Sequence, residues 1–214
     1  SGVHGALQFL DQHAADYAGR VNLLVAPCVS PWAYERIHRW NPNAVDPNRS
    51  FRDDGLADEA AALMRLVAPV RDHALMHIDL HETTDTDETE FRPALAARDG
   101  KPFEPGEIPD GFYLVDDSES PEPEFQQALI EAVEQVTHIA PADGNGEIFG
   151  SPVAARGVIQ YPLKQLGLCA SITSAPYRTT TEVYPDSARV TPEQCNAAQA
   201  TAVCAAIDYV LVNP

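Results

Sequence analysis

The chain has 214 residues, of which 44% are hydrophobic and 21% are charged, and its formal net charge is −18 at pH 7. This length and composition are typical of one globular domain with a full hydrophobic core. Because nucleic acids and anionic membrane surfaces bind basic patches, the acidic balance argues against both as partners, and a well-solvated acidic surface explains it.

The first eighty residues alternate between helical and strand-like patterns of apolar residues. The run at 21–29 is apolar and rich in β-branched residues, which is typical of a buried parallel strand. In chain order we predict a helix at 6–17, this strand at 21–29, a short helix or turn at 31–40, a strong helix at 56–70 and a strand at 73–80.

A long acidic and Pro-rich stretch follows from Thr86 to Glu124, and we predict an exposed excursion there. A connection of this length inside a compact domain is usually functional or partly disordered. Near the end of the chain, Thr191 and Pro192 are the residue types of a helix N-cap and first position. After the excursion we predict a helix at 123–139, a Gly-rich loop at 144–150, strands at 166–173 and 179–183, and a last helix to about Val212.

Buried strands that alternate with helices predict a single α/β domain over residues 1–214, with a mixed, mostly parallel sheet and helices on both faces. In such sheets ligands bind at the carboxyl ends of the strands. His4, His81 and Glu182 all lie at or just beyond predicted strand ends. Residues 1–5 have the pattern of a strand-to-loop junction, so we expect N-terminal strands of the domain to precede Ser1, outside the sequence as given.

The cysteines have no CxxC spacing and lie in apolar runs, so we predict buried free thiols. No apolar run approaches the ~20 residues that a membrane-spanning helix needs, and no signal peptide is visible. We therefore expect a cytoplasmic protein, whose oligomeric state the sequence leaves open. The four cysteines are Cys28, Cys169, Cys195 and Cys204.

Two short motifs indicate the chemistry of a hydrolase. Asp46-Pro47-Asn48-Arg49 presents an arginine, whose planar fork of donors matches a carboxylate in bidentate fashion. The strand at 73–80 is followed directly by His81, and histidine is the commonest ligand of zinc in proteins. Together they predict an enzyme that grips an anionic substrate while a metal ion activates water.

These motifs belong to an ordered set that resembles the zinc carboxypeptidase superfamily, which also contains the aspartoacylase and succinylglutamate desuccinylase deacylases. The Asp-Pro-Asn-Arg and Asp-Leu-His elements are specific as an ordered pair, and the resemblance runs from the first residue to the last helix. The set consists of Gly2-Val3-His4-Gly5, Ser30-Pro31, Asp46 to Phe51, Asp79-Leu80-His81 and Thr181-Glu182.

The resemblance implies a site for one zinc ion. His4 resembles the family's first zinc ligand, in a loop after a strand, and His81 resembles the last. Asp46 would hold His4 by a hydrogen bond, as metal-bound imidazoles usually require, and Asp79 would be a second supporting carboxylate. The family's other ligand is a glutamate three residues after the first histidine, whereas Leu7 stands at that position here.

Three explanations of Leu7 are open. A segment between Gly5 and Ala6 is missing from the sequence as given, which the abrupt start inside the same motif favours. Alternatively Gln8 substitutes as a weak ligand, or the site has lost its metal and the chain is a binding domain.

The resemblance also implies how a substrate is handled. Asn48 and Arg49 resemble the pair that binds the terminal carboxylate, and Arg39 resembles the arginine that polarises the scissile carbonyl. Glu182 resembles the general base, and Tyr161 matches by position the mobile tyrosine that covers bound substrate. The implied function is a metallocarboxypeptidase that hydrolyses an amide bond next to a free C-terminal carboxylate of a peptide. An N-acyl-amino-acid deacylase and a metal-free binding domain are the alternatives.

Each of these residues also has an ordinary structural interpretation. His81 could be a strand-end histidine with satisfied hydrogen bonds, and the Asn-Arg pair could be a turn with a surface ion pair. Glu182 could be an exposed position of an edge strand. Arg36 competes with Arg39 for the same role, because sequence alone does not fix how the helix at 31–40 is placed.

Overall fold

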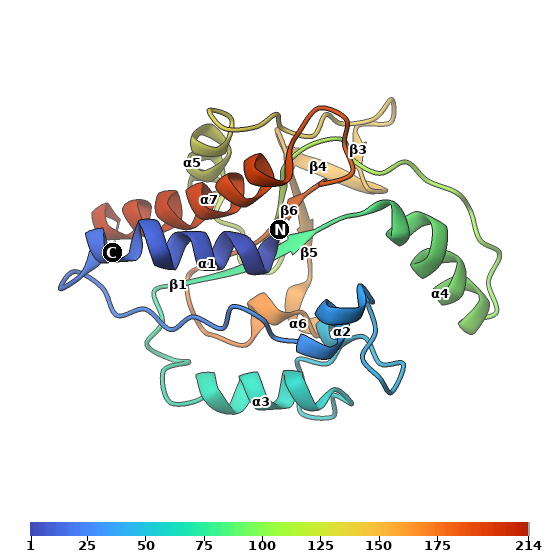
Figure 1. The fold of residues 1–214 in the computed structure, drawn as a ribbon, viewed down its shortest axis with the longest axis horizontal. Coiled ribbons are helices and arrows are strands. Elements are labelled where there is room, and N and C mark those ends of the chain that lie inside the picture. Colours follow the sequence, from blue (N-terminus) through green and yellow to red (C-terminus); the bar gives the residue numbers. More distant parts are fainter. Residues whose placement is uncertain (214) are drawn as a thin grey trace.

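A mixed sheet of six strands forms the centre of the domain (Figure 1). The computed structural model describes residues 1–213. From one edge to the other, the strands follow the order β1-β6-β2-β5-β4-β3. Their bounds are β1 Met76–Glu82, β2 Tyr113–Asp117, β3 Glu147–Ile148, β4 Ser151–Ala155, β5 Val158–Tyr161 and β6 Tyr177–Val183.

Most of the paired residues in this sheet belong to parallel strands. β1 and β6 are parallel over seven residue pairs, and β2 and β5 are parallel over four. The antiparallel contacts of β2 with β6, β3 with β4 and β4 with β5 cover three, two and two residue pairs. The predicted mixed, mostly parallel sheet is therefore confirmed.

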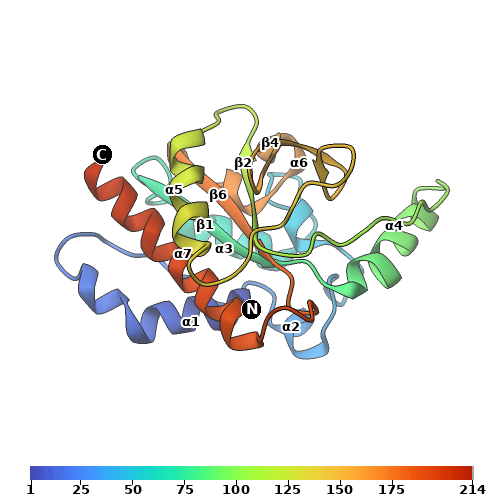
Figure 2. The same ribbon diagram turned by 90° about the horizontal axis from the view of Figure 1, so that it is seen from above.

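Helices cover both faces of the sheet, as predicted (Figures 1 and 2). α1, α5 and α7 pack together on one face, and α2, α3 and α6 lie on the other side. α4 projects away from the body of the domain in both views. The bounds are α1 Gly2–Gln12, α2 Pro31–Arg36, α3 Asp58–Val67, α4 Arg92–Arg98, α5 Pro123–Val133, α6 Leu163–Leu166 and α7 Pro192–Val212, with short 3-10 turns at Ala14–Tyr17, Pro47–Arg49 and Cys169–Ser171 and a π turn at Asp87–Phe91.

The last helix, α7, begins where the sequence predicts. The Thr191 hydroxyl accepts a hydrogen bond from the Gln194 backbone, and the Gln194 side chain accepts one from the Thr191 backbone, which forms a capping box. By length and mean hydropathy, 1.3, α7 could cross a membrane, so the expectation that no segment reaches this length is wrong. Half of this stretch is buried inside the domain, as in the core helix of a globular protein.

Two buried glutamines hold β6 from the helical side of the sheet. Gln126 of α5 accepts a hydrogen bond from the Thr179 hydroxyl at 2.8 Å, and Gln199 of α7 accepts one from the Thr181 hydroxyl. Gln199 also donates to the carbonyl oxygen of His81 at 2.6 Å. Because side chains alternate along a strand, the neighbouring residues of β1 and β6 face the opposite side, where the candidate site lies.

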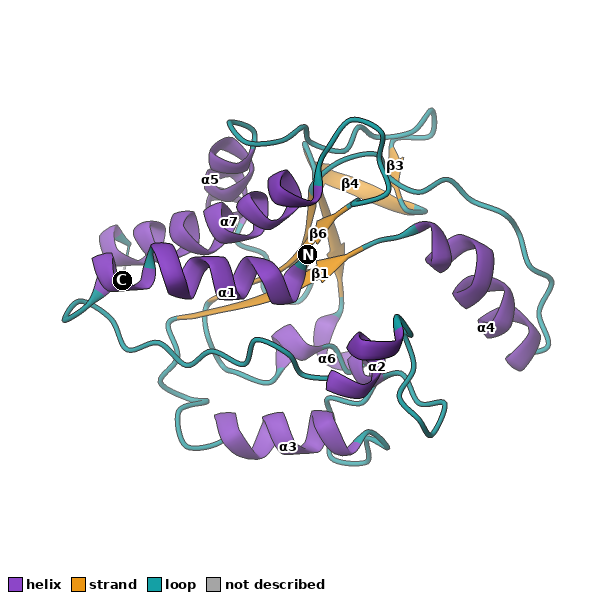
Figure 3. Ribbon diagram, viewed as in Figure 1, coloured by secondary structure: helices purple, strands orange, loops and turns teal. Residues whose placement is uncertain are grey.

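The predicted strand at 21–29 is wrong. This run has no strand pairing and is drawn as a loop in Figure 3, and Leu23 and Leu24 within it are 40% and 52% exposed. Pro27 interrupts the run, and proline lacks the N–H group that a strand ladder needs. Apolar composition alone therefore overestimates the strand content here.

The predicted strand at 166–173 is also wrong. Gly167 has a φ of +66°, a left-handed conformation that ends α6, and the chain then turns through Cys169–Ser171. Conversely, β2 lies inside the predicted exposed excursion, yet all five of its residues are buried. Its apolar Phe112-Tyr113-Leu114-Val115 run is the signal of this strand in the sequence.

All four cysteines are free thiols, as predicted. Cys169 and Cys195 are buried, whereas Cys28 and Cys204 are only partly so. Burial raises the pKa of the Cys169 thiol well above its usual value, which makes it a packing residue and a poor nucleophile.

Candidate functional site

A pocket of about 90 Å³ lies where β1 and β6 end at their carboxyl sides. The strand ends, the turn at Pro47–Arg49, the segment after α2 and strand β5 all contribute side chains to it. Predicted site residues that line this pocket are Arg39, Asn48, Arg49, His81, Tyr161 and Glu182.

The parallel register of β1 and β6 brings two of these residues together. His81 is paired with Glu182, and Asp79 is paired with Thr180 two positions earlier. Residues two apart on a strand face the same side. The sheet therefore places Asp79, His81 and Glu182 on one face, where His81 and Glu182 line the pocket, although more than one hundred residues separate the first from the last along the chain.

His81 is held by a buried carboxylate. Its Nε2 lies 3.0 Å from Oδ2 of Asp79. Burial alone would lower the pKa of His81, but the Asp79 charge outweighs it and raises that pKa to about 9. Burial likewise opposes ionisation of Asp79, yet the charge of His81 lowers its pKa. Because Oδ2 has no aligned hydrogen-bond donor, the pair is held mainly by charge.

The Asn48 amide faces the same ring. Its Oδ1 accepts a hydrogen bond from the Cys169 backbone at 2.9 Å, which leaves Nδ2 at 3.3 Å from Nε2 of His81. A single ring nitrogen either donates to Asp79 or accepts from Asn48. With the imidazole protonated, the contact with Asp79 prevails, and the Asn48 amide keeps hydrogens for another acceptor.

Glu182 has the environment of a proton acceptor. Its Oε2 accepts a hydrogen bond from the Thr83 hydroxyl at 3.1 Å, and that hydroxyl also contacts the Tyr113 hydroxyl at 2.9 Å. Burial raises the pKa of Glu182 to about 7, against the opposing charge of His81. A carboxyl group in this range exchanges its proton near neutral pH, as a general base must. No motif in the sequence marks Thr83 or Tyr113 as a partner of Glu182.

Arg39 is bound by two carboxylates. Its Nε lies 3.3 Å from Asp46 and its Nη1 lies 2.9 Å from Asp87, while the guanidinium stacks 3.9 Å from the centre of the Phe91 ring. Arg36 instead stacks on Trp32, and neither residue lines the pocket. The structure therefore places Arg39 at the pocket, with much of its charge already compensated.

Asp46 organises the Asn-Arg turn. Its Oδ1 accepts a hydrogen bond from the Asn48 backbone at 2.9 Å, and Pro47 occupies the first helical position, so the residue types themselves specify the turn. Asp46 contacts Arg39 and this turn, so the expectation that it would hold His4 is wrong. Within residues 1–213, Arg49 has no salt-bridge partner; its Nη1 donates to the Asn48 carbonyl oxygen at 2.8 Å, and its remaining donors are available to an anion in the pocket.

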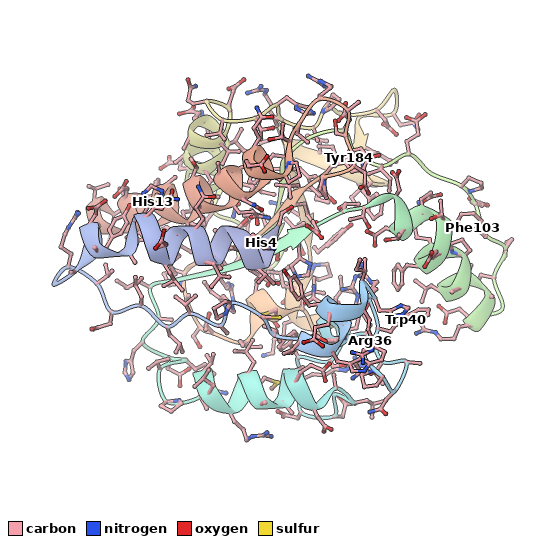
Figure 4. All side chains as sticks on the ribbon, viewed as in Figure 1. His4, His13, Arg36, Trp40, Phe103 and Tyr184 are labelled. Atoms are coloured by element: carbon pink, nitrogen blue, oxygen red, sulfur yellow. The ribbon has the colours of Figure 1, made fainter. Side chains whose placement is uncertain are left out.

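His4 lies outside this pocket. It belongs to α1 and not to a loop after a strand, is exposed, and its Nε2 is 2.9 Å from the Tyr34 hydroxyl (Figure 4). Leu7, one turn later, is 47% exposed, and the Gln8 side chain bonds to Gln12. In residues 1–213, no three His, Cys, Asp or Glu side chains are grouped closely enough to hold a metal ion. The donors of this part of the chain therefore do not fit a zinc site.

Tyr161 occupies a strand of the sheet. It is the last residue of β5, it lines the pocket, and its hydroxyl accepts a hydrogen bond from Ser151 at 3.2 Å. Asp87 and Phe149 also line the pocket, from the predicted excursion and the predicted Gly-rich loop, and neither carries a motif.

A larger surface hollow of about 580 Å³ lies near the end of α5. Its two arginines are engaged, Arg156 with Glu134 and Arg189 with Asp110. The smaller pocket is the stronger candidate because it combines an available arginine with a carboxyl group that titrates near neutral pH.

No model of a known protein family matches this sequence, and no curated protein matches it. Two solved structures share its fold, both described as presumed metallopeptidases. One, from Shewanella amazonensis SB2B, has a TM-score of 0.60 and 22% identity over 97% of this chain and 71% of that chain. The other, from Shewanella baltica OS155, has a TM-score of 0.58 and 22% identity over 97% of this chain and 70% of that chain. The chain therefore has a metallopeptidase-like α/β fold.

Proposed function

We propose that this pocket hydrolyses an amide bond next to a free carboxylate, the reaction of a carboxypeptidase. The observation that carries the proposal is that Arg49, His81 and Glu182, from three distant segments, line one pocket. The shared fold with two presumed metallopeptidases supports the same class of reaction.

In this proposal Arg49 binds the substrate carboxylate, and the Asn48 amide adds a hydrogen bond. Glu182 accepts the proton of the attacking water and returns it to the leaving nitrogen. His81, charged and paired with Asp79, supplies positive charge beside Glu182. Arg39 adds positive charge at the pocket rim, weakened by Asp46 and Asp87.

Metallopeptidases use a bound metal ion to activate the attacking water. Of the two predicted histidine ligands only His81 lines the pocket, and residues 1–213 contain no group of three donors. We therefore assign no step to a metal, and zinc stays a prediction from the family resemblance.

The test compares wild type with Glu182→Gln, and with Glu131→Gln on the exposed side of α5 as a matched control. Substrates are N-acetyl-amino acids and N-blocked dipeptides, and metal content is measured on the same samples. We expect Glu182→Gln to lower turnover by about 10²- to 10⁴-fold and the control to leave it unchanged. Absence of wild-type turnover on both substrate classes, with or without added zinc, would refute the proposal.

Two alternatives each have one supporting observation. The lack of three grouped donors in residues 1–213 favours a metal-free domain that binds carboxylates without hydrolysis. The small pocket volume of about 90 Å³ favours a deacylase of acyl-amino acids over a peptidase. Binding without turnover would support the first alternative, and turnover of N-acetyl-amino acids but not of dipeptides would support the second.

A further inference from the structure

One side of the pocket is apolar, and this property indicates which class of substrate the pocket binds. We propose that Val115, Phe149, Ile159 and Leu168, here called the apolar wall, select a ligand with an apolar side chain next to its carboxylate. This inference rests on the proposed function, because it takes the pocket as the substrate site.

The division between polar and apolar lining follows the order of the strands. β1 and β6 contribute His81 and Glu182, whereas the next strands, β2 and β5, contribute Val115 and Ile159. Val115 and Ile159 are register partners and are 4% and 0% exposed. Leu168, 4% exposed, packs in the same core cluster. Phe149 is the wall residue with the most accessible surface, and Val115, Ile159 and Leu168 belong to the core cluster against which it packs. A ligand bound to Arg49 thus meets charged groups on one side and chiefly the Phe149 ring on the other.

Phe149 is a residue type that its own turn does not favour. It and Gly150 connect β3 to β4, and both have positive φ, +52° and +72°. Two-residue hairpins of this kind favour Asn-Gly, because a side chain with a β-carbon is strained in the left-handed region. Non-glycine residues held in such conformations are concentrated at functional sites.

The Phe149 ring therefore has a role in the pocket as well as in the turn. It lines the pocket, it packs partly against the core cluster that contains Ile159 and Leu168, and the Arg92 guanidinium lies 5.5 Å from its centre. Contacts with the Arg92 guanidinium and with this core cluster hold the ring in the pocket lining.

Side chains differ in how well they suit this wall. A single methylene in an apolar pocket discriminates by about tenfold or more. A charged side chain placed against this wall would lose its hydration, and none of the four wall residues is ionisable; the ionisable residues of the pocket lining are not part of the wall. Because hydrocarbon forms this side of the pocket lining, an aliphatic side chain such as that of leucine suits it.

The experiment measures binding, so that it does not depend on turnover. N-acetyl-leucine, N-acetyl-lysine and N-acetyl-aspartate are titrated into wild type, Phe149→Gly and Ile37→Gly by calorimetry. Ile37 is a matched control: its φ is +55°, glycine suits that conformation equally, and its side chain is 87% exposed and outside the pocket lining. We expect wild type and Ile37→Gly to bind the leucine derivative at least about tenfold more tightly than the other two.

Phe149→Gly should reduce this preference about three- to tenfold, because the ring is removed while glycine adopts the same backbone conformation without strain; the lost packing against the core cluster should lower thermal stability. Equal binding of the three ligands, preference for a charged one, or binding of none would overturn the inference. If Phe149→Gly fails to fold, the wild-type comparison decides alone. A leucine preference without turnover of any amide would refute the proposed function and leave this inference standing.

Discussion

The raised pKa of Glu182 predicts how folding stability depends on pH. In the folded protein burial raises this pKa from 4.5 to about 7. Folding therefore favours the protonated carboxyl, so the stability that Glu182 contributes is fully present below about pH 4.5 and is lost as pH rises through 7. At about 1.4 kcal/mol per pKa unit the full shift corresponds to about 3 kcal/mol. Partial exposure of Glu182 to solvent reduces this, and we expect about 2 kcal/mol.

Glu182→Gln isolates this effect, because glutamine imitates the protonated carboxyl and does not titrate. Urea unfolding of wild type and variant is followed by circular dichroism at pH 4.5, 6, 7 and 8. We expect the two free energies of unfolding to agree within about 0.5 kcal/mol at pH 4.5, which is the internal control. At pH 8 the variant should be the more stable by about 2 kcal/mol. A difference that stays constant over this range would refute the account of Glu182.

Two further predictions concern the groups around it. Gln199→Leu should lower the free energy of unfolding by about 2 to 3 kcal/mol in urea titrations. The reason is that the Thr181 hydroxyl and the His81 carbonyl oxygen both lose their hydrogen bond to the buried Gln199 side chain. Gln127→Leu, on the exposed side of α5, should change it by less than about 0.5 kcal/mol, and equal effects of the two would contradict the assignment. Arg49→Ala should weaken N-acetyl-leucine binding about 10- to 100-fold in calorimetry, and more than Arg39→Ala does, because Asp46 and Asp87 already compensate Arg39. A larger loss for Arg39→Ala would show that Arg39 is the principal carboxylate ligand.

The residues that the sequence predicts well are those whose position depends on short-range rules. His81 and Glu182 lie near the carboxyl ends of two strands, and parallel pairing places such ends at one edge. Asn48 and Arg49 lie in a turn that Asp46 caps and Pro47 starts. These features are visible in four or five consecutive letters, and the fold needs only to bring the segments together.

The features that the sequence misses depend on distant contacts. β2 is buried because β5 and β6 pair with it on both sides. The acidic residues around it in the sequence indicate an exposed segment instead. The run at 21–29 is apolar, yet Pro27 and the lack of a strand partner leave it as a loop. Phe149 lines the pocket from a turn with a left-handed backbone conformation, and no sequence motif predicts this.

His4 shows why the metal is harder to infer than the carboxylate grip. The backbone ladder of β1 and β6 fixes His81 beside Glu182, whatever precedes β1 in the chain. The direction of His4 depends instead on the phase of α1, which starts at Gly2 and turns the imidazole toward Tyr34. A shift of one residue in a helix rotates a side chain by about 100°. The position of His4 therefore depends on the local sequence around Gly5 and Ala6, whereas the proton acceptor and the anion-binding turn of the pocket are held by separate elements.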